Sequence, residues 1–146
     1  MAFISNMQTS QKTKGELIFE VHDKSTTTTV RDISQSGIKL EQNSVSQVKG
    51  KLNGQGMTTV SFTQKTDGSS DWEMKGVIST KDGDFLAVMG NGTGKATGPT
   101  TAEWTGEVHF MSQSPKLSWL NNVTGWVEGS GDQAKGESWG KIYEQK

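Results

Sequence analysis

The feature that most constrains this chain is a period-two alternation of apolar and polar residues, repeated in short segments. Near the N-terminus, Leu17, Phe19 and Val21 alternate with polar side chains. Successive side chains of a β-strand point to opposite faces, so such segments indicate half-buried strands. Similar segments recur at intervals of roughly 10–14 residues, a spacing typical of all-β domains. The alternation predicts about eight or nine strands.

Tight turns separate the expected strands. Asp67-Gly68 and Asp82-Gly83 are two-residue hairpin signals, because aspartate and glycine tolerate the positive φ of such turns. Asn53-Gly54 and Asn91-Gly92 have the same form. Sequential hairpins build an up-and-down meander, and its closure into a barrel removes the exposed edges. We therefore expect an antiparallel β-barrel.

A short helical turn interrupts this pattern near residues 115–121. Ser114 is a favourable N-cap residue, and Pro115 suits the first helical position. Three apolar residues would share one side of the turn: Leu117, Trp119 and Leu120. We expect this turn to plug one mouth of the barrel.

Two further segments have distinctive compositions. Residues 25–34 are rich in threonine but poor in apolar residues, which is typical of an edge or connecting strand. The segment around residues 84–90 is apolar at both parities, which is typical of a strand covered on both faces.

Length and charge limit the function classes. A chain of 146 residues is one domain's worth, and we expect a loose arm over residues 1–14 and a single barrel over residues 15–146. A net charge of −1, without clustered positive charge, argues against nucleic-acid and anionic-membrane partners. Cysteine is absent, and no apolar run approaches the roughly 18 residues of a membrane helix. We expect a cytoplasmic protein.

Both histidines of the chain, His22 and His109, follow Glu-Val. Two Glu-x-His units could supply imidazole and carboxylate ligands to a metal ion. In both units, however, the valine belongs to the apolar stripe, so the period of two sends the imidazoles outward. We interpret them as solvent-facing strand residues and predict no metal site.

The glycine-rich segment 90–98 superficially resembles a phosphate-binding loop. Ala96 stands where a P-loop needs the Ser or Thr that holds Mg²⁺, and no helix is expected to follow. We interpret the segment as a flexible hairpin loop.

From Gly50 onward, the order of turn and strand motifs becomes recognisable. "GKLNGQG" is followed by "TDGSSDWEMKGVISTKDGDFLAVMGNGTGK", "AEWTGEVHF", a leucine-rich turn, "VTGWVEG" and "ESWGKIYE". Over residues 15–144, this order resembles a bacterial family of uncharacterised small proteins whose fold is similar to the allene oxide cyclase barrel. The resemblance implies a closed, eight-stranded antiparallel barrel, lipocalin-like in shape. It does not extend to the catalytic residues of the plant cyclase.

Aromatic and methionine side chains are the candidate ligand-binding residues. Those on the expected inward parities are Trp72, Met74, Phe85, Met89, Trp104 and Phe110. They would form either a packed core or an adaptable apolar cavity.

The last strand offers two alternatives. If Trp139 and Tyr143 face inward, Glu137 and Lys141 share that face and could orient a polar ligand head or transfer a proton. If Ile142 faces inward instead, all four lie at the surface. We retain Glu137, Trp139 and Tyr143 as candidate ligand-binding residues.

The leading hypothesis is a barrel that binds a small apolar molecule in its lumen, with no cofactor. An isomerase or cyclase acting on a flexible apolar substrate is the first alternative, because positioning and one acid or base suffice for such chemistry. The second alternative is a packed barrel with a structural role whose outer face forms a homo-oligomer.

Overall fold

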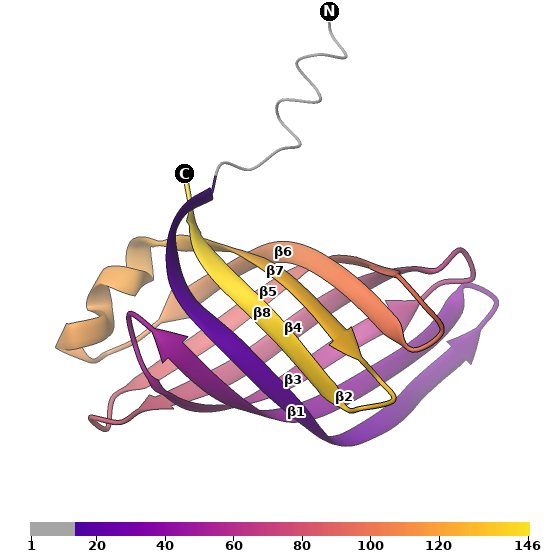
Figure 1. Cartoon of the computed structure of the whole chain (residues 1–146), viewed down its shortest axis with the longest axis horizontal. Helices are drawn as coiled ribbons and strands as arrows, with labels where there is room; N and C mark the ends of the chain where they lie inside the picture. The colour runs from indigo at the N-terminus through magenta and orange to yellow at the C-terminus, as the bar shows by residue number, and fades with distance from the viewer. Residues whose placement is uncertain (1–13) are drawn as a thin grey trace, which may run out of the picture.

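Eight antiparallel strands form a closed barrel in the computed structural model, which describes residues 14–146. The strands follow one another around the barrel in chain order (Figure 1). Their bounds are β1 Lys14–Ser34, β2 Gly37–Gly50, β3 Gly54–Gln64, β4 Ser69–Thr80, β5 Phe85–Ala96, β6 Thr101–Met111, β7 Thr124–Asp132 and β8 Glu137–Gln145. The expected fold class is confirmed. Lys14, assigned to the loose arm, begins β1 and pairs with Gln145; the remainder of that arm, residues 1–13, lies outside the described residues.

Strand β1 has two halves with different neighbours. Lys14–Lys24 pairs with β8 on one side and, from Phe19, with β2 on the other, whereas the segment beyond Ser25 pairs with β2 alone. Residues 25–34 therefore form an edge, as their threonine-rich composition predicted.

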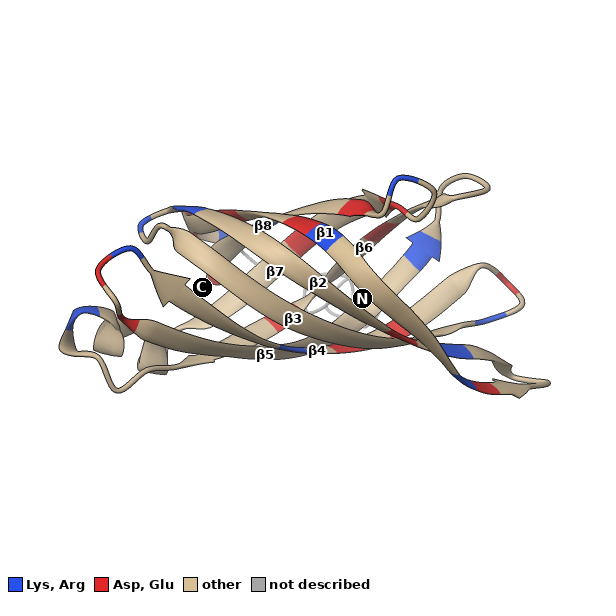
Figure 2. Cartoon of the chain, turned by 90° about the horizontal axis from the view of Figure 1, so that it is seen from below, with Lys and Arg blue, Asp and Glu red and all other residues tan. Residues whose placement is uncertain are grey.

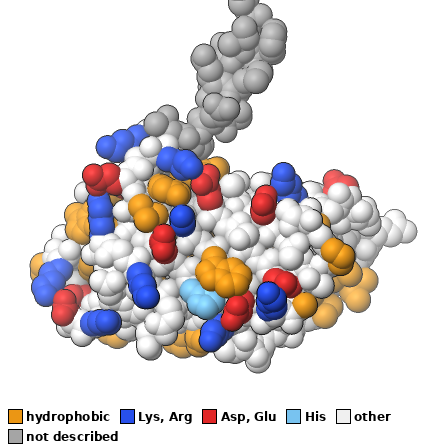
Figure 3. Space-filling model, in the orientation of Figure 1, with side chains coloured by type: hydrophobic (Ala, Val, Ile, Leu, Met, Phe, Trp, Pro, Cys, Tyr) orange, Lys and Arg blue, Asp and Glu red, His pale blue; other side chains and the backbone are white. Residues whose placement is uncertain are grey.

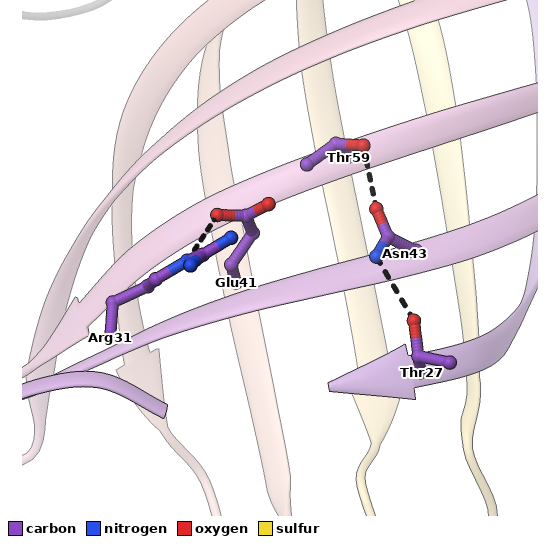
Figure 4. Close-up of polar contacts among 5 residues, drawn as sticks. All are labelled: Thr27, Arg31, Glu41, Asn43 and Thr59. Atoms are coloured by element: carbon purple, nitrogen blue, oxygen red, sulfur yellow. Dashed lines mark hydrogen bonds and ion pairs between the residues drawn. The ribbon is translucent and has the colours of Figure 1, made fainter. Parts of the chain in front are cut away.

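Side-chain hydrogen bonds on the outer wall hold this edge to its neighbours (Figure 4). Asn43 on β2 donates to Thr27 on β1 over 3.0 Å and accepts from Thr59 on β3 over 2.7 Å. Farther along the edge, Arg31 pairs with Glu41, with 2.7 Å between Nε and Oε2. These polar contacts link β1, β2 and β3 where β8 no longer accompanies β1.

The apolar core fills one end of the barrel. Phe19, Leu86 and Val108 point inward from their strands and are at most 2% exposed. The predicted helical turn is a 3₁₀ helix, η1, over Pro115–Asn122, and its buried Leu117 and Leu120 join the same core. This end of the barrel is thereby closed, as expected.

Two details of the predicted turn are wrong. The Ser114 side chain makes no capping hydrogen bond. Trp119 is 39% exposed and lies outside, with the ammonium of Lys51 over its ring at 5.6 Å from the centroid. In a 3₁₀ helix, side chains repeat every three residues, so Leu117 and Leu120 share a face from which Trp119 is excluded.

The glycine-rich half of β5 also corrects the sequence analysis. Residues 90–96, expected in a hairpin loop, continue the strand, and the turn to β6 falls at residues 97–100. Leu86 and Val88 face inward, whereas Phe85 and Met89 are 63% and 41% exposed. The outer face of β5 is therefore not covered. The inward-facing glycines of this strand alternate in step with Leu86 and Val88. The glycines and these two residues therefore share the face of β5 that points into the barrel, which the apolar pattern alone did not decide.

A register shift near the start of β1 changes which of its side chains face inward. The pairing of β1 with β8 shifts between Leu17 and Phe19. As a result, Ile18 and Phe19 are both buried, while Leu17 is 37% exposed. The stripe predicted from Leu17 through Val21 therefore holds only from Phe19 onward.

Candidate functional site

The barrel encloses a blind cavity of about 450 Å³. Its floor is the apolar core, with Phe19, Val48 and Ile142 among the lining residues. Its mouth lies at the end opposite η1, where residues of the β3–β4, β5–β6 and β7–β8 connections line it. Small-molecule sites in proteins occupy about 300–1,000 Å³, so the cavity has the size of a ligand site.

Two tryptophans and a methionine form the apolar walls. Trp72, Met74 and Trp104, all predicted site residues, line the cavity. The indole N–H of Trp72 donates to the carbonyl of Thr93 over 3.2 Å, so its polar atom is satisfied by the wall. The ring lies against Gly92, where an added Cβ would approach Cζ2 of Trp72 to 2.7 Å. Glycine at the paired position of the neighbouring strand β5 makes room for a large ring inside a narrow barrel.

A polar cluster around Asp23 interrupts the apolar wall. Asp23 on β1 lines the cavity and accepts hydrogen bonds from Ser46 on β2 and, over 3.5 Å, from Ser138 on β8. Burial raises the pKa of the Asp23 carboxyl above its ordinary value, and the two hydroxyl hydrogen bonds oppose the rise. A second polar pair, in which Gln42 donates to Ser25, lies on the same walls. The lumen is therefore amphipathic.

Asp23 was not among the predicted site residues, although a signal for it exists. Phe19, Val21 and Asp23 share one parity, so the inward stripe ends on a carboxylate. The stripe was traced only to Val21, and the adjacent His22 was assigned to the outer face, so Asp23 was not recognised as an inward residue.

Three predicted residues of the apolar set, Phe85, Met89 and Phe110, do not line the cavity. Phe110 is 6% exposed and packs in the core edge-to-face against Phe19, with ring centroids 6.2 Å apart. Phe85 points outward from β5, as described above. Phe110 thus supports the floor, and Phe85 belongs to the outer wall.

The last strand follows the second alternative, because Ile142 faces inward and is 5% exposed. Trp139 stacks on His22 of the outer wall, with centroids 5.0 Å apart, and Tyr143 lies beneath the ammonium of Lys14. Glu137 lies at the mouth, where its carboxylate is 3.8 Å from Nε2 of His22. Trp139 is therefore among the residues that line the mouth, but its ring, like that of Tyr143, lies on the outer wall and not in the lumen. Gly140 and Ile142 occupy the inward parity of this strand.

The outward orientation of the two histidines is confirmed. Val21 and Val108 line the lumen, and the imidazoles beside them lie on the outer wall. Figure 3 shows an imidazole at the surface with a large hydrophobic side chain next to it. His22 belongs to β1 and His109 to β6, so β7 and β8 lie between them. Within residues 14–146, no group of three or more histidine and acidic side chains could hold a metal ion.

The fold and the site define the class of this protein: it is a closed, eight-stranded antiparallel barrel with an amphipathic lumen. None of the helices in residues 14–146 has the length and apolar character needed to cross a membrane. The sequence matches no protein-family model and no curated protein.

Solved structures show the same fold. A protein of unknown function from Clostridium acetobutylicum superposes with a TM-score of 0.81 at 16% identity, covering 93% of this chain and 98% of that one. A protein of unknown function from Rhodopseudomonas palustris has a TM-score of 0.79 at 13% identity, with coverages of 93% and 99%. An enzyme from Penicillium herquei has a TM-score of 0.71 at 23% identity, with coverages of 93% and 98%. At these identities, the likeness establishes the barrel and not an activity.

Proposed function

We propose that the protein binds a small, mainly apolar molecule with one hydrogen-bonding group in the barrel lumen. The observation that carries the proposal is a blind cavity of about 450 Å³ whose tryptophan-lined wall contains the carboxyl of Asp23, hydrogen-bonded by Ser46. An apolar body would lie against Trp72 and Trp104, and its polar group would meet Asp23 and the adjoining serines. The alternative of a solidly packed barrel does not account for this cavity.

The fluorescent probe N-phenyl-1-naphthylamine tests the proposal, because it is uncharged and brightens in apolar surroundings. We expect saturable binding of one probe per chain, with energy transfer from Trp72 and Trp104. Val60→Trp places an indole in the lumen and should abolish binding. Ser61→Trp, on the outward parity of the same strand, is the matched control. Absence of saturation, or equal binding by both variants, contradicts the proposal.

Competition between 2-naphthol and naphthalene tests the polar end of the site. These competitors differ by one hydroxyl, which would donate to Asp23. A hydrogen bond to a charged acceptor contributes about 1.5–3 kcal/mol, so we expect 2-naphthol to displace the probe at least about tenfold better. Asp23→Leu should remove this advantage while leaving naphthalene binding intact.

A second candidate function, an isomerase or cyclase, is favoured by the same carboxyl. Burial raises the pKa of Asp23, and an acid or base in an apolar pocket can transfer protons to a bound substrate. One structural neighbour is itself described as an enzyme.

The Kemp elimination of 5-nitrobenzisoxazole measures this capacity directly. In that reaction a carboxylate removes the proton from C3, the C–N triple bond forms, and the N–O bond breaks to release a coloured phenolate. We expect wild-type protein to accelerate the reaction and Asp23→Asn to lose the acceleration. Equal rates with both proteins would remove Asp23 from a catalytic role.

A further inference from the structure

The outer wall of β2–β6 carries exposed apolar side chains in cross-strand register. Val45 on β2 pairs with Met57 on β3, and Met57 pairs with Val77 on β4. Val77 in turn pairs with Ala87 on β5, and Ala87 with Met111 on β6. One row of five apolar residues therefore crosses five consecutive strands.

Two neighbours on β5, Phe85 and Met89, widen this row. We name the seven residues the β2–β6 face: Val45, Met57, Val77, Phe85, Ala87, Met89 and Met111. Met57, Phe85 and Met111 are 68%, 63% and 59% exposed. Val45, Val77 and Met89 are 48%, 44% and 41% exposed. Single exposed apolar residues need no explanation, but a contiguous row of this kind marks an interaction site.

Charge is sparse on this face. β3 contains no charged residue and β5 contains only Lys95, so β3 is tan along its whole length in Figure 2. Lys75, paired with Thr59 and Met89, and His109, paired with Met89, border the face. By contrast, Figure 3 shows acidic and basic side chains intermixed on the opposite side, over β1 and β8. Two copies of the β2–β6 face could therefore meet through its uncharged row, with Lys75 and His109 at the border.

The exposed area suits a dimer. With about 150–250 Å² for each large side chain, the six large residues of the face expose roughly 500–800 Å². A standard interface buries about 800 Å² from each partner, and its rim supplies the remainder. Methionines, which provide three of the seven residues, adapt readily to an opposing surface.

We infer that the β2–β6 face binds a second copy of this chain and forms a two-fold symmetric dimer. In such an interface the same patch serves both subunits, so an uncharged, self-complementary row suffices. The cavity mouths, formed by the strand connections, stay open. The inference is independent of what the lumen binds.

Sedimentation equilibrium over a range of protein concentrations tests the inference. Wild-type protein should have twice the mass of one chain. The double variant Met57→Lys, Val77→Lys places four charges in the interface and should raise the dimer dissociation constant about thirtyfold or more. Ser130→Lys, on the exposed outer side of β7, is the matched control and should leave the dimer intact. Circular dichroism melting verifies that each variant is folded.

Oxidation by hydrogen peroxide gives a second measurement. Met57 and Met111 should oxidise more slowly as the dimer forms, and the double lysine variant should restore fast oxidation of Met111.

Three results would overturn the inference. The first is a wild-type monomer at every concentration. The second is a dimer that survives both lysine substitutions, which would place the interface elsewhere. The third is a monomer that binds phosphatidylcholine vesicles through the β2–β6 face, which would assign that face to lipid.

Discussion

Gly129 and Gly140 are directly opposite each other on β7 and β8, yet the space above them differs. A Cβ added at Gly129 would lie 2.6 Å from Cε2 and 3.0 Å from Cζ2 of Trp104. At Gly140 the closest atoms, Cγ2 of Val127 and the carbonyl oxygen of Glu128, lie 3.7 and 3.8 Å away. Alanine therefore fits at Gly140 but collides with a rigid indole ring at Gly129.

The two alanine substitutions should have opposite effects on the free energy of unfolding. Overpacking costs about 1–3 kcal/mol, whereas the reduced freedom of the unfolded chain contributes about 0.4–1 kcal/mol of stability at either site. We expect Gly129→Ala to destabilise by about 1–2 kcal/mol and Gly140→Ala to stabilise by up to about 1 kcal/mol. At about 3 °C per kcal/mol for a chain of this length, the melting temperatures should differ by roughly 3–9 °C.

Urea unfolding and calorimetry measure this difference, and probe binding adds an independent readout. Because Trp104 lines the cavity, a ring displaced by Gly129→Ala should also weaken the binding of N-phenyl-1-naphthylamine, whereas Gly140→Ala should leave the binding unchanged. Equal melting temperatures for the two variants, or a less stable Gly140→Ala, would refute the account of glycine and tryptophan packing in the lumen.

Three further perturbations probe the lumen, its closed end and the outer wall. Burial raises the pKa of Asp23, so the folded state binds its proton more tightly than the unfolded state does, and stability falls as the pH rises from the ordinary value of 3.8 through the folded-state pKa. Asp23→Asn should remove that fall in urea titrations across this range, and an unchanged profile would contradict the burial of the carboxyl. Leu120→Ala, at a position 0% exposed, should cost about 2–5 kcal/mol in urea unfolding, and Trp119→Ala, at a position 39% exposed, should cost less than half as much. Zn²⁺ should leave the melting temperature unchanged in wild type, His22→Ala and His109→Ala. If Zn²⁺ raised the melting temperature of wild type and either variant lost this increase, a metal site on the outer wall would be indicated.

The architecture could be predicted because its signals are local. Asp67-Gly68 and Asp82-Gly83 mark hairpins, and both glycines adopt positive φ in the structure, 86° and 89°. Alternation within single strands placed Trp72 and Trp104 on the inner wall.

Parity was misplaced on β5 and left open on β8, where the strands carry bulky residues on both of their faces. On β8, Trp139 and Tyr143 outweigh Ile142 in size, yet the inward face contains Gly140. The lumen is narrow, so the ring of Trp104 on β6 requires Gly129 at the paired position of β7. That complementarity joins residues far apart in sequence, and no single segment reveals it. The same reasoning explains β5, where Gly92 faces Trp72 and brings Leu86 and Val88 inward.

The omission of Asp23 has a different cause. Pattern analysis follows apolar residues, so the first stripe was traced only as far as Val21 and the polar Asp23 was left without a placement. In the structure the period of two continues without interruption, and Asp23 takes the inward position after Val21. A carboxyl at an inward position costs stability unless hydrogen bonds compensate, and Ser46 and Ser138 on the two neighbouring strands supply them. Three strands thus contribute to one polar cluster in the wall of the lumen. A packed core does not need such a cluster, whereas a ligand with one polar group does.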